Sequence, residues 1–192
     1  GNKGTDEVVT AGCTIMINDF VLALEKAINA ATDSDATADD TVKVALVSTQ
    51  TGSKDATADA AGVNEVDTTV AAAVLNKDGK AVAMATDALQ GKVNFDAKGV
   101  TEDAAGAITT KLGAKENYGM AQYGQDLNGD GTVKEWFEQA DAFNAACVGK
   151  TATEIKALAI ETGYGIDTLQ SAGCTINVAD LVKAAANAAT IG

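Results

Sequence analysis

The sequence predicts an α+β fold in which helices pack on an antiparallel sheet that contains a β-hairpin. Residues 41–48 (TVKVALVS) alternate and are rich in valine, which is typical of a strand. The apolar runs 66–75 and 80–89 flank Asn76-Lys77-Asp78-Gly79, and an Asp-Gly pair favours the positive φ angles of a hairpin turn. Residues 49–65 are predicted to form a polar loop and residues 93–96 a short edge strand.

Two helices are predicted in the second half of the chain. The first spans residues 133–146 and places Trp136, Ala140 and Phe143 on one face. Residues 151–154 (TATE) have the spacing of a capping box, in which the threonine and glutamate side chains each accept a backbone hydrogen bond. This pattern predicts a further helix that runs to Ile160.

An internal repeat links the two ends of the chain. Residues 6–15 (DEVVTAGCTI) match residues 167–176 (DTLQSAGCTI) at a constant offset, and the match continues into Ala-rich stretches with helical periodicity. Each copy is therefore predicted to be a turn or short strand that leads into a helix, with Asn18 or Asp19, and Asp180, near its start. The apolar positions are Phe20, Ala23, Leu24, Ala27 and Ile28 in one copy and Leu181, Ala184, Ala185 and Ala188 in the other.

The repeat also predicts how the chain is divided. Residues 1–32 are interpreted as the tail of a preceding repeat, and residues 33–192 as the main α+β domain. The duplicated strand-helix element then stands at both termini, and we expect the two parts to pack as one globule. Sister domains upstream of this sequence fit the same interpretation.

The composition excludes several classes of function. The chain has 192 residues and a formal charge of −13, from 27 acidic and 14 basic residues, which repels nucleic acid and anionic lipid surfaces. It contains no histidine, so every Ser-His or Cys-His catalytic arrangement is absent. These observations favour a protein that is not an enzyme.

The start of the sequence, Gly1-Asn2-Lys3-Gly4, has no signal-peptide core, and no apolar run is long enough to cross a bilayer. A short start of this kind on an acidic domain fits a secreted protein or a lipoprotein, and it also fits a cytosolic chain. We expect a location in the cell envelope or outside the cell, with membrane contact only through an N-terminal lipid anchor.

Three cysteines do not make a disulfide framework. Cys13 and Cys174 occupy equivalent positions of the repeat, so a symmetric packing could bring them together. The alternative is that each is a small buried thiol, which is common for free cysteine. Cys147 follows a helical apolar stripe and is predicted to lie in the core.

Residues 126–132 (DLNGDGT) have the D-x-N-x-D-G spacing of a calcium loop, in which alternate oxygens converge on the ion. The predicted calcium ligands are Asp126, Asn128, Asp130 and the carbonyl of Thr132. The twelfth position, which normally carries the closing carboxylate, is Phe137. The alternative is a turn rich in Asp and Asn that caps the helix containing Trp136.

The motif Ser171-Ala172-Gly173-Cys174-Thr175, followed by Leu181, Val182, Ala184 and Ala188, resembles the end of the FMN-binding domain family. That family typically shows an Asp, then Ser-Gly-Ala-Thr, then a helix with an Ala-Val-x-x-Ala pattern. The hairpin with Lys77-Asp78-Gly79-Lys80 is similar to its strand, Asp-Gly-Lys and strand signature. Members include peripheral flavin subunits of electron-transport complexes.

The resemblance implies an FMN-binding-domain-like fold and FMN held on a threonine through a phosphoester bond. The residues it assigns to the cofactor are Thr175 and Gly173, with Thr14 and Gly12 in the duplicate, and Asp167 and Asp6 are the upstream acidic positions. The sequence departs from the family pattern in three places. Glycine and the small residue are exchanged, Asp167 lies one residue further away, and Asn177 stands where a serine or threonine is usual.

Three further segments resemble envelope lipoproteins of Gram-positive anaerobes, a family without an established activity: residues 118–120, 134–140 and 148–152. Our leading hypothesis is an exported or lipid-anchored envelope module that binds a ligand or partner without catalysis. The alternatives are an FMN-binding electron-transfer domain and a calcium-ordered structural repeat of a surface protein.

Overall fold

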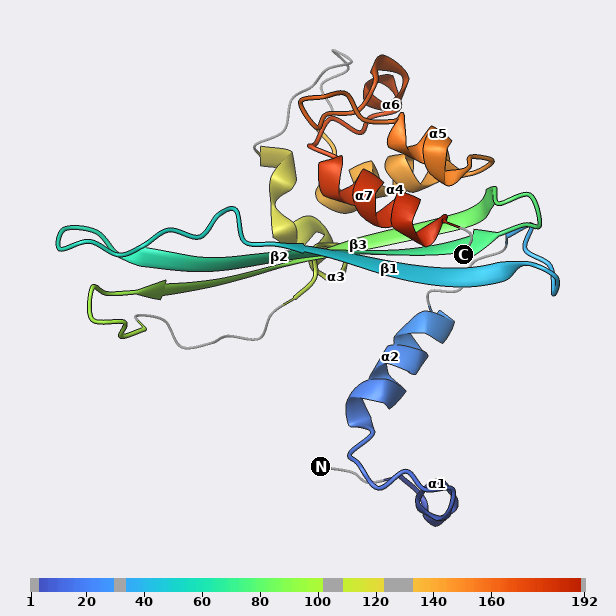
Figure 1. The fold of residues 1–192 in the computed structure, drawn as a ribbon, viewed down its shortest axis with the longest axis horizontal. Helices are drawn as coiled ribbons and strands as arrows, with labels where there is room; N and C mark the ends of the chain where they lie inside the picture. Colours follow the sequence, from blue (N-terminus) through green and yellow to red (C-terminus); the bar gives the residue numbers. More distant parts are fainter. Residues whose placement is uncertain (1–3, 30–33, 102–108, 123–132, 191–192) are drawn as a thin grey trace. The chain divides into compact units, whose positions relative to one another are not determined.

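The computed structural model describes residues 4–29, 34–101, 109–122 and 133–190. It confirms the α+β class and the antiparallel sheet (Figure 1). The chain divides into two compact units, Gly1–Ser34 (unit 1) and Asp35–Gly192 (unit 2). The predicted boundary, after residue 32, lies two residues from this one. Packing of the two units as one globule stays a prediction.

Within the described part of unit 2, three strands form an open sheet in the order β1-β2-β3. They are β1 (Thr41–Thr49), β2 (Gly62–Leu75) and β3 (Ala81–Phe95). The predicted hairpin turn is confirmed: Asn76 Oδ1 accepts hydrogen bonds from the amides of Asp78 and Lys80, each at 3.0 Å, and Gly79 has a φ of +72°.

The hairpin is longer than predicted. Gly62 pairs with Phe95, so residues 62–65 belong to β2 instead of the loop, and residues 93–95 end β3 instead of forming a separate strand. Two adjacent strands supply each other's backbone hydrogen bonds, and this pairing extends both beyond their apolar cores.

The helices of unit 2 follow the sheet in the chain. They are α3 (Lys111–Ala114), the 3-10 turns η1 (Lys115–Tyr118) and η2 (Met120–Gln122), α4 (Trp136–Cys147), α5 (Ala152–Lys156), α6 (Asp167–Ser171) and α7 (Ala179–Ala188). The capping box at α5 is confirmed: the Thr151 amide donates to Glu154 Oε2 at 2.8 Å. However, α5 ends at Lys156 instead of Ile160, because the chain turns back and Ala159 forms a bridge with Gly165.

The core lies between the sheet and helices α4 and α7, which lie against the same face of the sheet (Figure 1). Trp136, Ala140 and Phe143 are buried on one face of α4, as predicted. The buried residues of α7 are mostly alanines, and such small side chains let helix and strands approach closely. The larger buried side chains fill the space around them: Val47, Leu75, Ile155, Leu158, Leu169, Val178, Leu181 and Val182.

Unit 1 contains α1 (Asp6–Thr10) and α2 (Asn18–Asn29). Its apolar side chains are largely exposed: Phe20 is 65% exposed and Ile28 is also 65% exposed. Among the described residues of the whole chain, no helix is long and apolar enough to cross a membrane.

Candidate functional site

The two copies of the repeat have the same local structure. Each consists of a five-residue helix, a glycine turn and a second helix (α1–α2 and α6–α7). Gly12 has a φ of +99° and Gly173 a φ of +94°, a region that other residues rarely adopt. The amides of Cys13 and Cys174 each donate to the carbonyl oxygen five residues earlier, at 3.1 Å. Of the two predicted alternatives, turn or strand, the described structure has the turn.

In unit 2 the turn is held by one buried side chain, Gln139 of α4, which is 1% exposed. Its Oε1 accepts three hydrogen bonds: from the amide of Thr175 at 2.8 Å, from the hydroxyl of Thr175 at 3.1 Å and from the amide of Ile176 at 3.2 Å. Its Nε2 donates to the carbonyl of Lys134 at 2.9 Å. The side-chain amide of Gln139 therefore forms hydrogen bonds through both its oxygen and its nitrogen. The predicted cofactor threonine, Thr175, already has a hydrogen-bond partner.

The predicted cofactor residues of unit 1 have a different environment. Thr14 and Gly12 are exposed, and residues 1–34 contain no glutamine that could take the part of Gln139. In unit 2, Gly173 is buried and lies beside Lys134, whose Nζ donates to the carbonyl of Ala172 at 3.2 Å. The two glycines thus serve the backbone turn in both copies.

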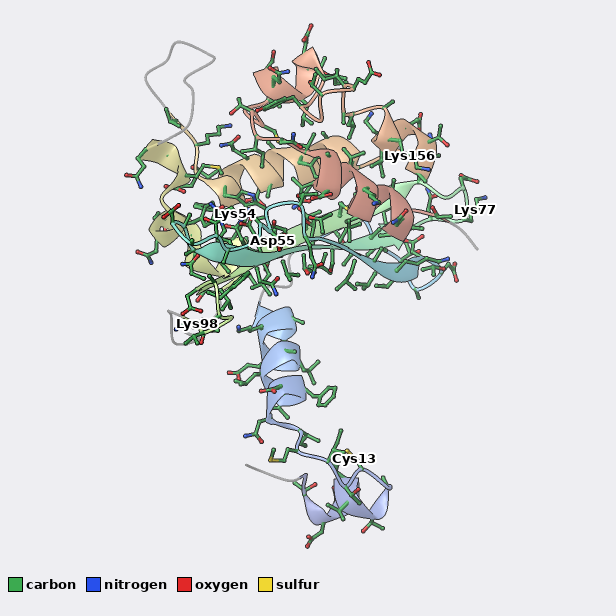
Figure 2. All side chains as sticks on the ribbon, turned by 60° about the vertical axis from the view of Figure 1, so that its left-hand side comes forward. Cys13, Lys54, Asp55, Lys77, Lys98 and Lys156 are labelled. Carbon is green, nitrogen blue, oxygen red and sulfur yellow. The ribbon has the colours of Figure 1, made fainter. Side chains whose placement is uncertain are left out.

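Unit 1 carries an apolar groove of about 310 Å³. It is lined by Cys13, Ile15, Ile17, Phe20, Val21 and Leu24. Figure 2 shows Cys13 in the turn between α1 and α2. The equivalent positions of the second copy belong to the core of unit 2 or pack against it: Cys174, Ile176, Val178, Leu181, Val182 and Ala185.

The contrast between equivalent residues is large. Phe20 is 65% exposed and its counterpart Leu181 is 4% exposed; Leu24 is 62% exposed and its counterpart Ala185 is 0% exposed. Leaving large apolar side chains in water is unfavourable, and contiguous patches of them commonly mark interaction sites. The groove is therefore the part of unit 1 where binding of another apolar surface would be most favourable.

A second hollow, of about 230 Å³, lies at the amino end of α7. Its lining residues are Asp67, Thr68, Thr69, Ala88, Leu89, Lys111, Trp136, Asn177, Asp180 and Leu181. The Lys111 ammonium lies 5.2 Å from the centre of the Tyr118 ring and 5.9 Å from that of Trp136, within range of cation–π attraction. The hollow is smaller than most ligand pockets, and no lining residue is a serine, cysteine or histidine.

The three cysteines all lie in described residues and are free thiols. Cys13 is half-buried, whereas Cys147 and Cys174 are buried as predicted. Burial raises the pKa of Cys147 to about 12 and that of Cys174 to about 11. A thiol must ionise to act as a nucleophile, so neither buried cysteine is activated for chemistry.

The predicted calcium ligands, Asp126, Asn128, Asp130 and Thr132, lie outside the described residues, so this loop stays a prediction. Among the residues that the structure does describe, no group of three or more His, Cys, Asp or Glu side chains is arranged to hold a metal ion. A calcium-dependent rise in melting temperature would be the direct check of the loop.

Comparison of the chain with protein-family models, with curated proteins and with solved structures gave no match. The site must therefore be interpreted from its own residues. The role of Gln139 was not predicted, although a polar side chain on the helix face of Trp136 and Phe143 was a signal. The groove positions Ile15 and Ile17 were also not predicted, because their exposure depends on what packs against them.

We expect matched substitutions at equivalent positions to differ in cost. Leu181→Ala should lower the free energy of unfolding of unit 2 by about 2–5 kcal/mol, because it empties space in a packed core. Phe20→Ala should change the free energy of unfolding of unit 1 by less than about 0.5 kcal/mol in dilute solution, because Phe20 is exposed. In urea unfolding, the fluorescence of Trp136 reports on unit 2 and far-UV circular dichroism reports on the helices of both units; equal costs would contradict the contrast between the copies.

Thiol labelling should separate the three cysteines. At pH 8 we expect Ellman's reagent to modify Cys13 rapidly and the other two only after denaturation, since they are buried and their raised pKa values keep them neutral. Unfolded thiols ionise near pH 8.5, so the stability that neutral Cys147 and Cys174 contribute should decline above that pH and towards pH 11–12. Cys13→Ser is the control: it should abolish the fast phase.

Proposed function

We propose that this chain is a non-enzymatic binding module of the cell envelope, exported or lipid-anchored, that recognises a protein partner. The observation that carries the proposal is the groove of unit 1. The same helix–turn–helix element buries its apolar face in unit 2, yet in unit 1 it leaves a groove with Phe20 and Leu24 more than half exposed. Exposed apolar surfaces of this kind commonly mark contacts with another protein surface.

The chemistry of the described residues supports binding over catalysis. The chain has no histidine, and its two buried thiols are held neutral. The Thr175 hydroxyl donates a hydrogen bond to the side-chain oxygen of Gln139, and an amide oxygen is too weak a base to activate it. Turnover of a defined small substrate by rigorously purified protein would defeat this part of the proposal.

The groove should be accessible to an apolar probe. In dilute solution we expect the fluorescence of the dye ANS to increase with this protein, and the double change Phe20→Ser with Leu24→Ser to reduce that increase several-fold. Leu22→Ser is the matched control, because Leu22 is on the same helix, does not line the groove and corresponds to exposed Lys183. Equal fluorescence from all three proteins would refute a functional groove.

An alternative is an FMN-binding-domain-like fold with a flavin on Thr175. In its support, Thr175 lies in the turn before α7, and the hollow lined by Asn177 and Asp180 is at the amino end of that helix. Against it, a phosphoester would remove the hydrogen bond from the Thr175 hydroxyl to Gln139.

Intact mass after co-expression with a flavin transferase tests this alternative. We expect an unmodified mass and no visible flavin absorption. An added mass of FMN that disappears in Thr175→Ala but persists in Thr14→Ala would make unit 2 a redox carrier.

A further inference from the structure

The sheet of unit 2 is apolar on both of its faces. One face is covered by α4 and α7, and we call the opposite face the outer face. On β1, Val42, Val44 and Leu46 are 69%, 60% and 65% exposed. Successive side chains of a strand point to opposite faces, so Lys43 points to the helix side, where its Nζ donates to the carbonyl of Thr190 at 3.1 Å. The strand thus presents its largest apolar side chains on the face without α4 and α7.

The neighbouring strands continue this surface. Val74, Ala72 and Val70 of β2 pair in register with the three exposed residues of β1, and Ala83 and Ala85 of β3 lie across from Val74 and Ala72. The second half of β2 is an unbroken apolar run. Such a run is typical of a strand covered on both faces, whereas a strand with one wet face alternates.

The groove of unit 1 is apolar like the outer face, and its counterpart in unit 2 already packs on a sheet. The equivalent element of unit 2 already packs on a sheet face, because α7 contacts both β1 and β2. Unit 1 carries larger side chains at the matching positions, with Leu24 for Ala185 and Ile28 for Ala189. This larger set suits an outer face built mainly from valine and alanine.

We propose that the outer face of the sheet binds the α1–α2 element of a second copy of this chain, and that the exchange is reciprocal. This inference rests on the proposed function, since it names the partner of the same groove. Reciprocal exchange gives a two-fold symmetric dimer in which both contacts are the same. Residues 30–40 separate α2 from β1, and an extended chain of that length would span up to about 40 Å, so the linker length by itself permits a contact with another copy.

The area available agrees with a two-contact dimer. A large apolar side chain offers on the order of 100 Å². With roughly 60% of each exposed, eight such side chains would together bury about 500 Å² of apolar surface at one contact. They are Ile15, Phe20, Val21, Leu24 and Ile28 of unit 1 and Val42, Val44 and Leu46 of β1. Stable interfaces bury about 1,200–2,000 Å², of which a little over half is apolar. Two contacts reach this range, and one does not.

The proposal predicts a dimer that needs both surfaces. Sedimentation velocity over a dilution series should show the native chain as a dimer that dissociates on dilution. The groove variant (Phe20→Ser with Leu24→Ser) and the sheet variant (Val44→Lys) should each associate at least 10-fold more weakly. The controls Leu22→Ser and Thr41→Lys, which put the same kinds of change on the same elements outside the contact, should behave as the native chain.

Mixing the two variants provides the decisive measurement. An equimolar mixture retains one intact contact, between the groove of the sheet variant and the outer face of the groove variant. We expect this mixture to associate more tightly than either variant alone and more weakly than the native chain, because its heterodimer has one intact contact in place of two. Labelling of Cys13 in the native chain should slow about 10-fold as the dimer forms. Circular dichroism and thermal melting of each variant establish that it is folded.

Two results would overturn the exchange. One is a native chain that is monomeric at all concentrations. The other is a mixture that associates no more tightly than either variant alone while the native chain dimerises. If either occurs while the groove still binds ANS, the groove remains a binding site and its partner is a different protein. If the groove binds no dye in dilute solution and no dimer forms, the proposed function fails with the inference.

Discussion

The fold of unit 2 depends on the buried amide of Gln139. Its oxygen accepts three hydrogen bonds from the turn that precedes α7, and its nitrogen donates to the segment that precedes α4. Because buried polar groups are costly unless bonded, this arrangement specifies one position for the turn. The position of this turn sets where α7 begins, and α7 lies against both β1 and β2. A single side chain therefore joins α4 to the repeated turn before α7, and both helices lie against the sheet.

The repeat shows that one local structure can have two different environments. Both copies form the same glycine turn with a positive φ, because the sequence Ala-Gly-Cys-Thr-Ile determines the turn locally. What each copy contacts depends on the rest of its unit. Unit 2 supplies Gln139, Phe143 and the sheet, whereas none of residues 4–28 of unit 1 is buried. The small residues of α7 suit a closely packed core, and the large residues of α2 suit a surface that is still to be covered.

The chemistry of the chain agrees with a role in assembly. The thiols of Cys147 and Cys174 are neutral at physiological pH because burial disfavours the thiolate, and the Thr175 hydroxyl is bonded to an amide. The surfaces that stand out are instead apolar: the groove of unit 1 and the outer face with Val42, Val44 and Leu46. These features favour protein contacts as the main use of the molecule.

The sequence by itself determined the elements whose signals are local. The Asp78-Gly79 turn, the strand at residues 41–49, the Trp136 helix and the Thr151 capping box follow from turn chemistry and periodicity, which act between near neighbours. Only the tertiary structure decided how far β2 and β3 extend, where α5 stops, that Gln139 holds the Thr175 turn, and that Phe20 is exposed where Leu181 is buried. The reason is that strand length, hydrogen-bond satisfaction and burial depend on residues far away in the chain, which periodicity does not encode.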